Sequence, residues 1–572
     1  MAPSTASPSE CVPNSSGDAI EMTSEMTSEP YPVSQDATGP ATDDSDSRGT
    51  WRIAATMLAL ALSLFVSALD QTIVATATPT ISAELHSGSG YVWIGGAYLI
   101  ANAASANIWA NLSDIWGRKP ILLAAVALFF GASIICAKAI DMPMLIAGRS
   151  VQGIAGGGLL QLILITISDL FSVRHRGLFM GLMEFIWAIA GALGPIMGGA
   201  FTQSVSWRWI FWINLPVCGT AFVLLLLFLD VHNPKTGVMD GIKAVDWFGS
   251  LSILGLVVML LLGLDFGGDT FPWSSPKVIC LIVFGCLMSL IFIYCERRLA
   301  KYPLMPLGIF HDKSNVACFV VAFTHGFAFL GEEYYLPLYF QSAQQASPFR
   351  SGILILPFVL SEAATSLLAG ILIHRSGRYL AIVRTGMFLV VVGSGLLINF
   401  TSDTPLPKII IYQLIAGSGC GLLFFPPLLA LQSNVSQADT ASATATFGFV
   451  RNVAMAMSVV LGGVVFQNSM DRRRGDLLRA GLDGDVVGRL SGSEAAANVL
   501  LVAGIGDVAV RGVVRAAYAW SLRNVWIMFT VLAGVGLLAS AFVTRQHLSD
   551  VHVETKTGLR EKEPSSSATS ER

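Results

Sequence analysis

The sequence predicts an all-α polytopic membrane protein with 14 transmembrane helices, arranged as two pseudo-symmetric six-helix halves plus two inserted helices. Three observations predict this fold class: the composition, the number of long apolar stretches and a short internal repeat. The 572-residue chain is 53% hydrophobic and 13% charged, and its mean hydropathy is +0.64. Soluble domains carry about 25% charged residues. The net charge of -3 gives no reason to expect a nucleic-acid partner.

The apolar stretches have the length and spacing of membrane-spanning helices. A helix needs about 20 apolar residues to cross the hydrocarbon core, and only helices and closed barrels satisfy their backbone polar groups in lipid. Fourteen stretches qualify, near 53–73, 91–111, 121–140, 144–166, 177–201, 209–229, 246–264, 277–295, 315–337, 351–373, 381–399, 408–431, 444–467 and 521–543.

Basic residues in the short loops predict the orientation. With the N-terminus in the cytosol, inner loops are rich in Lys and Arg, as in Arg118-Lys119 and Arg297-Arg298, whereas short outer loops hold few. This bias predicts that both termini are cytosolic. The long outer stretch 468–520 contains Arg472, Arg473 and Arg474, but long loops follow the charge rule poorly. Its segment AAANVLLVAGIGDVAV is a candidate interfacial or re-entrant helix.

The same features divide the chain into five parts. Residues 1–50 are rich in Ser, Thr, Pro, Asp and Glu, a composition that predicts a disordered cytosolic tail. The tail is followed by an N-terminal six-helix half (51–229) and by two inserted central helices with linkers (230–313). A C-terminal six-helix half (314–543) and a second cytosolic tail (544–572) complete the chain. We expect an integral multi-pass protein of the plasma membrane, with a vacuolar or vesicular membrane as the alternative.

An internal repeat links the two halves. LSDIWGRK (112–119) follows the second span, and LIHRSGRY (372–379) follows the tenth, so that Gly117 aligns with Gly377 and Arg118 with Arg378. Repeated halves are typical of secondary transporters, whose substrate site lies between repeats near the bilayer midplane.

Five motifs in order carry a family resemblance: LDQTIVATATPTI (69–81), LSDIWGRK, GRSVQGIAGGG (148–158), GALGPIMGG (191–199) and WRWIFWINLP (207–216). Over residues 51–545 the chain resembles the major facilitator superfamily, specifically its 14-span drug:proton antiporter branch. It is similar to fungal efflux pumps for toxins and secondary metabolites.

The charged turn is a candidate conformational gate. Gly117 permits the sharp bend, and Arg118 can anchor at the inner leaflet. The resemblance implies that Asp114 faces the start of the thirteenth span near Thr444 and that Arg118 pairs with Asp169. Such a network would stabilise the outward-open state. Simple anchoring by positive charge is the alternative interpretation.

Four residues are candidates for proton coupling and transport. Arg149 lies within a span, where a charge is costly and indicates function; the resemblance implies a role in proton coupling. Asp70 at similar depth is its candidate counter-ion, although Arg149 could instead reach the headgroups. Glu184 and Glu362 are candidate proton carriers, with Glu362 the deepest. Glu332 and its neighbour Glu333 are expected at a water-exposed mouth.

The glycine-rich motif predicts a close helix contact, and Pro195 permits a bend. The resemblance associates this motif with export. Its predicted packing residues are Gly191, Gly194, Pro195, Gly198 and Gly199. Asn399 begins an Asn-Phe-Thr glycosylation pattern at an outer helix end.

The function predicted from the sequence is proton-coupled export of small organic compounds by alternating access. Neither GxxxxGK[ST] nor HExxH nor GxSxG occurs, so the sequence indicates no ATP site and no hydrolase. We expect no enzyme activity, no cofactor and no metal, with substrate, protons and the bilayer as partners of a monomer. Proton-coupled uptake of a siderophore or nutrient and a membrane sensor on a transporter scaffold are the alternatives.

Overall fold

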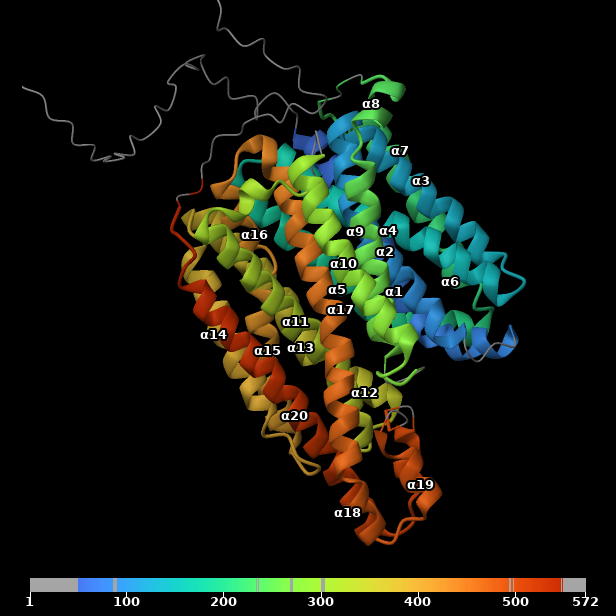
Figure 1. Cartoon of the computed structure of the whole chain (residues 1–572). Helices are drawn as coiled ribbons and strands as arrows, with labels where there is room; N and C mark the ends of the chain where they lie inside the picture. Colours follow the sequence, from blue (N-terminus) through green and yellow to red (C-terminus); the bar gives the residue numbers. More distant parts are fainter. Residues whose placement is uncertain are drawn as a thin grey trace, which may run out of the picture. The chain divides into compact units, whose positions relative to one another are not determined.

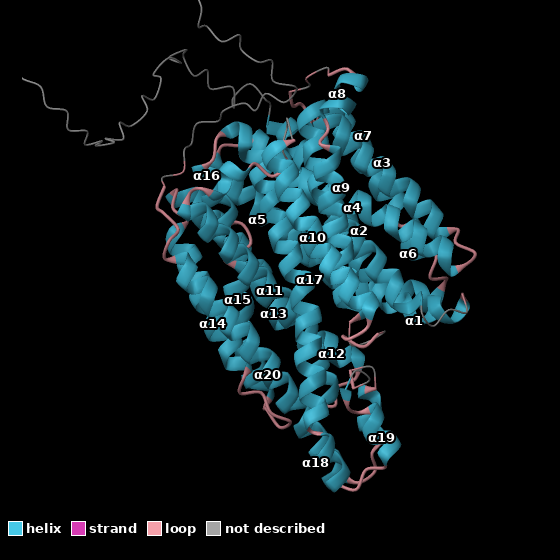
Figure 2. Ribbon diagram, in the orientation of Figure 1, coloured by secondary structure: helices cyan, strands magenta, loops and turns pink. Residues whose placement is uncertain are grey.

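The computed structural model describes residues 50–85, 90–232, 234, 236–267, 271–299, 304–492, 495–496, 498–546 and 548. These residues form α-helices and short 3-10 turns, and no strand is present among them (Figure 2). The predicted tails, at 1–50 and 544–572, lie almost wholly outside the described residues.

The N-terminal half contains the first six predicted spans (Figure 1). Its helices are α1 (Thr50–Glu84), α2 (Gly90–Trp116), α3 (Arg118–Ala137), α4 (Met142–Leu170), α5 (Val173–Ser204) and the pair α6 (Trp209–Trp212) and α7 (Asn214–Phe228). The short helix α8 (Val238–Ala244) then leads to the inserted helices α9 (Trp247–Phe266) and α10 (Pro276–Arg298).

The C-terminal half repeats the plan. Its helices are α11 (Lys313–Ser342), α12 (Pro348–Leu354) with α13 (Leu356–Ser376), α14 (Leu380–Leu397), α15 (Leu406–Gly421) with α16 (Pro426–Asn434), α17 (Thr440–Arg472) and α20 (Val508–Ser540). The short helices α18 (Arg474–Arg479) and α19 (Gly484–Arg489) connect the last two. Single-turn 3-10 segments, η1 (Leu307–Phe310), η2 (Gln437–Asp439) and η4 (Val499–Gly504), complete the described part.

Several helices begin at an aspartate for a local reason. The side chains of Asp141, Asp246, Asp312 and Asp507 accept hydrogen bonds from free backbone N–H groups in the first turns of α4, α9, α11 and α20. These N-cap bonds satisfy donors that the helix itself cannot satisfy. The local sequence therefore fixes where these helices start.

Thirteen helices in the described part are long and apolar enough to cross a membrane, which makes this an integral multi-pass protein. The predicted span 91–111 is helical as α2 but falls outside that set. Asn102, Asn107 and Asn111 lower its hydropathy, and all three are buried. The fourteen-helix plan thus holds, with one helix that faces protein more than lipid.

The long outer loop is shorter than the sequence predicts. We expected the spans to end at 467 and to resume at 521, whereas α17 continues to Arg472 and α20 begins at Val508. The candidate interfacial helix is instead the 3-10 segment η4 followed by the first turn of α20. Burial of Leu477, Val487 and Leu490 holds α18 and α19 against this outer end.

Both repeat turns need glycine. The backbone φ angle is 93° at Gly117 and 63° at Gly377, which is the left-handed region that glycine adopts without a steric penalty. The aligned arginines differ, because Arg118 is 1% exposed and Arg378 lies exposed at the surface. The repeat therefore preserves a glycine with a positive φ angle at the turn, but neither its ψ angle nor the burial of the arginine that follows.

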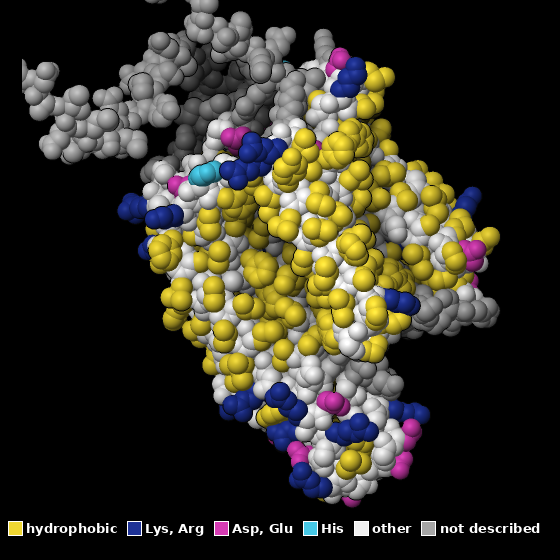
Figure 3. All heavy atoms as spheres, viewed as in Figure 1, with side chains coloured by type: hydrophobic (Ala, Val, Ile, Leu, Met, Phe, Trp, Pro, Cys, Tyr) yellow, Lys and Arg dark blue, Asp and Glu magenta, His cyan; other side chains and the backbone are white. Residues whose placement is uncertain are grey.

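Apolar side chains cover the middle of the visible face, and charged side chains gather at its two ends (Figure 3). Exposed large hydrophobic residues on α9 and α10 include Phe248, Leu251, Val283 and Leu290. Such an apolar band matches a surface in contact with lipid.

The close approach of α2 and α4 is testable at Gly153. A Cβ there would lie 2.3 Å from the Tyr98 carbonyl oxygen, whereas a Cβ at Gly131 on α3 would meet nothing within 4 Å. We expect Gly153→Ala to destabilise the protein by about 1–3 kcal/mol through overpacking. Gly131→Ala should be neutral or slightly stabilising. Thermal unfolding of both variants in detergent checks this, and equal midpoints would contradict the packing described.

Candidate transport site and inner gate

A buried ion pair lies within the N-terminal half. Arg149 on α4 is 1% exposed, Asp70 on α1 is 0% exposed, and the Arg149 guanidinium donates to the Asp70 carboxylate. Arg149 Nε also donates to the Ile94 carbonyl at 3.0 Å, and its guanidinium lies 4.5 Å from the Tyr98 ring centroid. Arg149 therefore does not extend to the headgroups, which was the alternative interpretation.

Neutral polar groups complete this cluster. The Gln152 amide donates to Asp70 Oδ1 and to the Ser133 hydroxyl, both at 2.9 Å. The Asn214 amide donates to the same Asp70 oxygen at 2.9 Å. Removal of one partner from a buried pair leaves an uncompensated charge, which costs about 3–5 kcal/mol. The cluster thus joins α1, α3, α4 and α7 into one unit.

The charged turn forms a second ion network. We call the end of the bundle that carries it the inner end. Arg118 Nε donates to Asp169 at 2.7 Å, and Arg118 Nη1 lies 2.5 Å from Asp114 and 2.6 Å from the Ser113 hydroxyl. One turn before Asp114, Ala110 packs against Ala441 and Ala445 at the start of α17. The structure thus brings together the four predicted gate residues, Asp114, Gly117, Arg118 and Asp169.

The two halves are hydrogen-bonded to each other at the inner end. Arg174 donates to the carbonyls of His374 at 2.6 Å and Arg375 at 2.9 Å. Arg176 donates to Gln432 at 3.1 Å, and Gln432 donates to Ser168 at 2.9 Å. Among the described residues, every recorded hydrogen bond between the halves lies at this end. Contacts between the halves therefore close the inner end.

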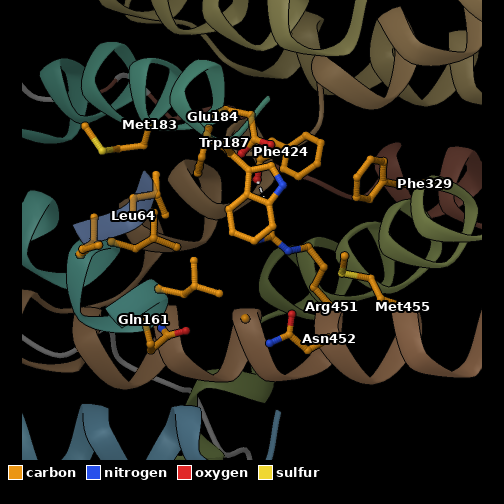
Figure 4. Close-up of a pocket in the computed structure, with 15 residues that line it drawn as sticks. Leu64, Gln161, Met183, Glu184, Trp187, Phe329, Phe424, Arg451, Asn452 and Met455 are labelled. Atoms are coloured by element: carbon orange, nitrogen blue, oxygen red, sulfur yellow. Dashed lines mark hydrogen bonds between the residues drawn. The ribbon is translucent and has the colours of Figure 1, made fainter. Parts of the chain in front are cut away.

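A cavity lies between the halves. The space between its lining residues amounts to about 760 Å³, a value that includes solvent at its open side. Its lining comes from α1, α4 and α5 of one half and from α11, α17 and the α15–α16 segment of the other (Figure 4). Aromatic and aliphatic side chains form most of its wall, among them Trp187, Phe329, Phe424, Met183 and Met455.

Charged and polar groups also face this cavity. Glu184 on α5 and Arg451 on α17 both line it and are close enough to interact electrostatically. The Arg451 guanidinium donates to the Phe424 carbonyl at 3.3 Å. Glu362 on α13 is 6% exposed, and its charge interacts with those of Glu184 and Glu333. The two predicted proton carriers thus lie near each other, across the boundary between the halves.

The glycine motif packs less uniformly than predicted. A Cβ at Gly194 would lie 2.0 Å from the Thr72 hydroxyl of α1, but a Cβ at Gly191 or Gly199 would meet nothing within 4 Å. Gly198 is buried, and its carbonyl accepts from Thr202 at 2.6 Å. The prediction of close packing is wrong for Gly191 and Gly199, because only one face of α5 touches α1.

Three further predicted residues have clear outcomes. Pro195 lies inside α5, but its side chain lies outside the described part. Asn399 is exposed beyond the end of α14, which suits its glycosylation pattern. Glu332 is not at a water-exposed mouth, because it is 0% exposed. It lies inside the C-terminal half, where its carboxyl group is hydrogen-bonded to the Ser394 hydroxyl of α14.

Sequence reasoning missed several members of these sites. Gln152 lies three residues after Arg149, so helical spacing placed it on the same face. Asn214 and Gln432 gave no such signal, because their contacts depend on how distant helices pack. The sequence marks Arg176 only as one of the basic residues near an inner loop, whereas it is 2% exposed and hydrogen-bonded to Gln432 of the other half.

Two linked helical halves with a cavity between them define a membrane transporter of the alternating-access type. The model of the Major Facilitator Superfamily matches residues 60–459. The chain belongs to this superfamily.

Two similar curated proteins come from fungi. It is 46% identical over 507 residues to "Efflux pump dotC" of Dothistroma septosporum (strain NZE10 / CBS 128990), covering 89% of this chain and 87% of the relative. It is 41% identical over 516 residues to "MFS-type transporter ppz2" of Metarhizium majus (strain ARSEF 297), covering 90% and 89%.

Solved structures share the fold at low identity. The human organic anion transporter MFSD10 matches with a TM-score of 0.54 and 16% identity, covering 86% of this chain and 99% of that one. The proton:xylose symporter XylE matches with a TM-score of 0.54 and 14% identity, covering 88% and 98%.

If the ion network of Arg118 keeps the inner end closed, its loss should shift the protein toward conformations with an open inner end. We expect Arg118→Ala to destabilise the state with a closed inner end by about 3–5 kcal/mol, since it leaves Asp169 buried without its cation. Lys119→Ala is the matched control, because Lys119 has no ion pair in the described part. Distances between spin labels at Arg52, a partly exposed residue at the inner end of α1, and Arg378 report separation of the halves at the inner end. A distance distribution unchanged by Arg118→Ala would contradict a gating role.

Proposed function

We propose that this protein exports small organic compounds, such as a drug, toxin or fungal secondary metabolite, in exchange for protons. The relative from Dothistroma septosporum is named an efflux pump and aligns along most of both chains, which supports export. The cavity between the halves, with Glu184 and Arg451 among aromatic side chains, is the observation that carries the proposal. The protein functions as a monomer with cytosolic termini, in the plasma membrane.

The cavity favours flat, largely apolar substrates. Trp187, Phe329 and Phe424 offer ring faces for stacking, while Gln161 and Asn452 offer amide groups for a few directed hydrogen bonds. Pockets of this kind bind drug-sized molecules through apolar walls and a small number of polar groups.

The charges in the cavity support proton coupling. An ionised Glu184 is balanced by Arg451, and a protonated one is not attracted to it, so proton binding changes how α5 of one half holds α17 of the other. Substrate can compete with that attraction from the same cavity. Glu362 adds a second carboxyl on the same boundary, and the Asp70–Arg149 pair transmits changes within the N-terminal half.

Alternating access requires the contacts at the inner end to break and form again. With the inner end closed, substrate leaves to the outer side and a proton enters from it, and the hydrogen bonds of Arg174 and Arg176 must break before the inner side opens to take up the next substrate. A ligand drives such a change only through a difference in affinity for the two states.

Flux in sealed proteoliposomes tests the proposal. We expect rhodamine 6G and ethidium to move against the proton flow when a pH gradient is imposed, and to reverse direction when the gradient is reversed. Glu184→Gln should reduce gradient-driven accumulation about tenfold for each pH unit of gradient, if it removes one coupled proton. Accumulation is measured by fluorescence with the membrane potential clamped at zero.

Asp403→Asn serves as the control, because Asp403 is an exposed carboxyl at the outer end. Dye movement in the same direction as protons would replace export by uptake. Movement that ignores the gradient would remove proton coupling from the proposal.

A further inference from the structure

Glu332 on α11 is a buried acidic group that the site described above does not use. Its side chain is 0% exposed, and its Oε1 is hydrogen-bonded to the Ser394 hydroxyl of α14. Its Oε2 has no hydrogen-bond partner in the described part of the chain. A carboxyl with one satisfied and one orphaned oxygen inside a helix bundle needs an explanation.

The position of Glu332 repeats that of Asp70. Asp70 stands 20 residues after the first residue of α1, and Glu332 stands 19 residues after the first residue of α11. Their serines also correspond, because Ser133 stands 15 residues into α3 and Ser394 stands 14 residues into α14. Each half thus buries one carboxyl on its first helix and one serine on its third.

The arginine of the first half has no equivalent in the second. Arg149 stands seven residues after the start of α4, and the same step from the start of α15 reaches Gln413. The Gln413 amide donates to the carbonyls of Leu354 at 2.9 Å and Ile409 at 3.1 Å. The Gln413 side chain is therefore neutral, and its amide group is already hydrogen-bonded to these two carbonyls.

The helices packed against α11 bring no positive charge to Glu332. The Cys420 thiol of α15 interacts with it electrostatically and carries no positive charge. Three arginines on the neighbouring helices are engaged elsewhere: Arg384 with Ala541, Arg451 with Phe424, and Arg515 with Ala343 and Ser402. Further basic residues on these helices are exposed, namely Arg350, Lys408, Arg472 and Arg523. His325, on α11 itself, contacts the Cys420 carbonyl at 3.0 Å.

An ionised carboxylate in this place would be a buried charge without a partner, which protein interiors avoid. A neutral carboxylic acid and the Ser394 hydroxyl can instead hydrogen-bond to each other. We propose that Glu332 is a proton-binding site of the C-terminal half, occupied by a proton in this conformation, and that it carries one of the protons moved during transport. The inference rests on the proton coupling in the proposed function.

The proton step needs no other bond change. Rearrangement of α11 against α14 admits water, the Glu332 O–H gives its proton to that water, and the carboxylate takes up a proton again from the opposite side. Asp70 differs, because Arg149 balances its charge in the closed cluster. The carboxyl at this position is thus ionised and paired with a counter-ion in the N-terminal half (Asp70), and protonated and without a counter-ion in the C-terminal half (Glu332).

Infrared spectroscopy of the full-length protein in lipid nanodiscs tests whether Glu332 is protonated. At near-neutral pH we expect the wild type to show the C=O stretching band of a buried carboxylic acid, and Glu332→Gln to lose the intensity of one such group. Ser394→Ala should shift the frequency of that band by removing its hydrogen-bond partner. Asp403→Asn, an exposed carboxyl change, should leave the band unaltered. A wild-type band in Glu332→Gln would overturn the assignment.

Accumulation of rhodamine 6G in proteoliposomes tests the coupling. With one proton fewer per cycle, Glu332→Gln should lower the plateau of accumulation about tenfold for each pH unit of gradient, while dye exchange without a gradient continues. A merely structural residue would change the rate of approach and not the plateau. A plateau equal to wild type overturns the coupling role of Glu332 alone. A wild type that ignores the gradient overturns the proposed function as well.

Discussion

An ionised side chain in a low-dielectric interior must have a partner, and the arrangement of this protein depends on that constraint. Asp70 and Arg149 come from α1 and α4 and neutralise each other without solvent. Arg118 and Asp169 do the same for α3 and α4 at the inner end. Each pair is costly to break singly, so together they fix the relative positions of these helices. Apolar packing in lipid supplies no comparable specificity, because the lipid tails are as apolar as the helix surfaces.

The two repeats share a backbone plan but divide the charges unequally. The turn glycines Gly117 and Gly377 both have a positive φ angle, but their ψ angles are 158° and 18°, and only Gly117 is followed by a buried arginine. The cation at the α4 position has become Gln413 at the α15 position. The N-terminal half therefore works as a rigid, ion-paired unit. In the C-terminal half the buried carboxyl of Glu332 is hydrogen-bonded to a single hydroxyl, that of Ser394. Loss of the Glu332 proton can therefore change how α11 packs against α14.

Hydrogen bonds link the two halves to each other, whereas buried ion pairs link helices within the N-terminal half. The recorded hydrogen bonds at the inner end run from Arg174 and Arg176 of one half to carbonyl and amide oxygens of the other, and from the Gln432 amide to the Ser168 hydroxyl. No salt bridge recorded among the described residues crosses the boundary. Hydrogen bonds from a charged donor contribute about 1.5–3 kcal/mol each, less than the cost of breaking a buried ion pair. An interface of this kind can close firmly and still open within a transport cycle, while the units on either side keep their shape.

The sequence by itself determined the number and limits of most helices, the two-half plan and the repeat turns. These depend on local facts: a helix satisfies its own backbone, the bilayer sets its length, and a glycine or an aspartate marks its start. It also indicated Asp70 beside Arg149, and Glu184 and Glu362 as carboxyls of interest. The tertiary structure alone decided that Gln152 and Asn214 complete the first cluster, that Arg176 reaches Gln432, and that Gly191 and Gly199 make no close contact. It also placed Glu332 inside a half and not at a mouth. The rotation of each helix about its axis decides these contacts, and that rotation is fixed by neighbours far away in the chain.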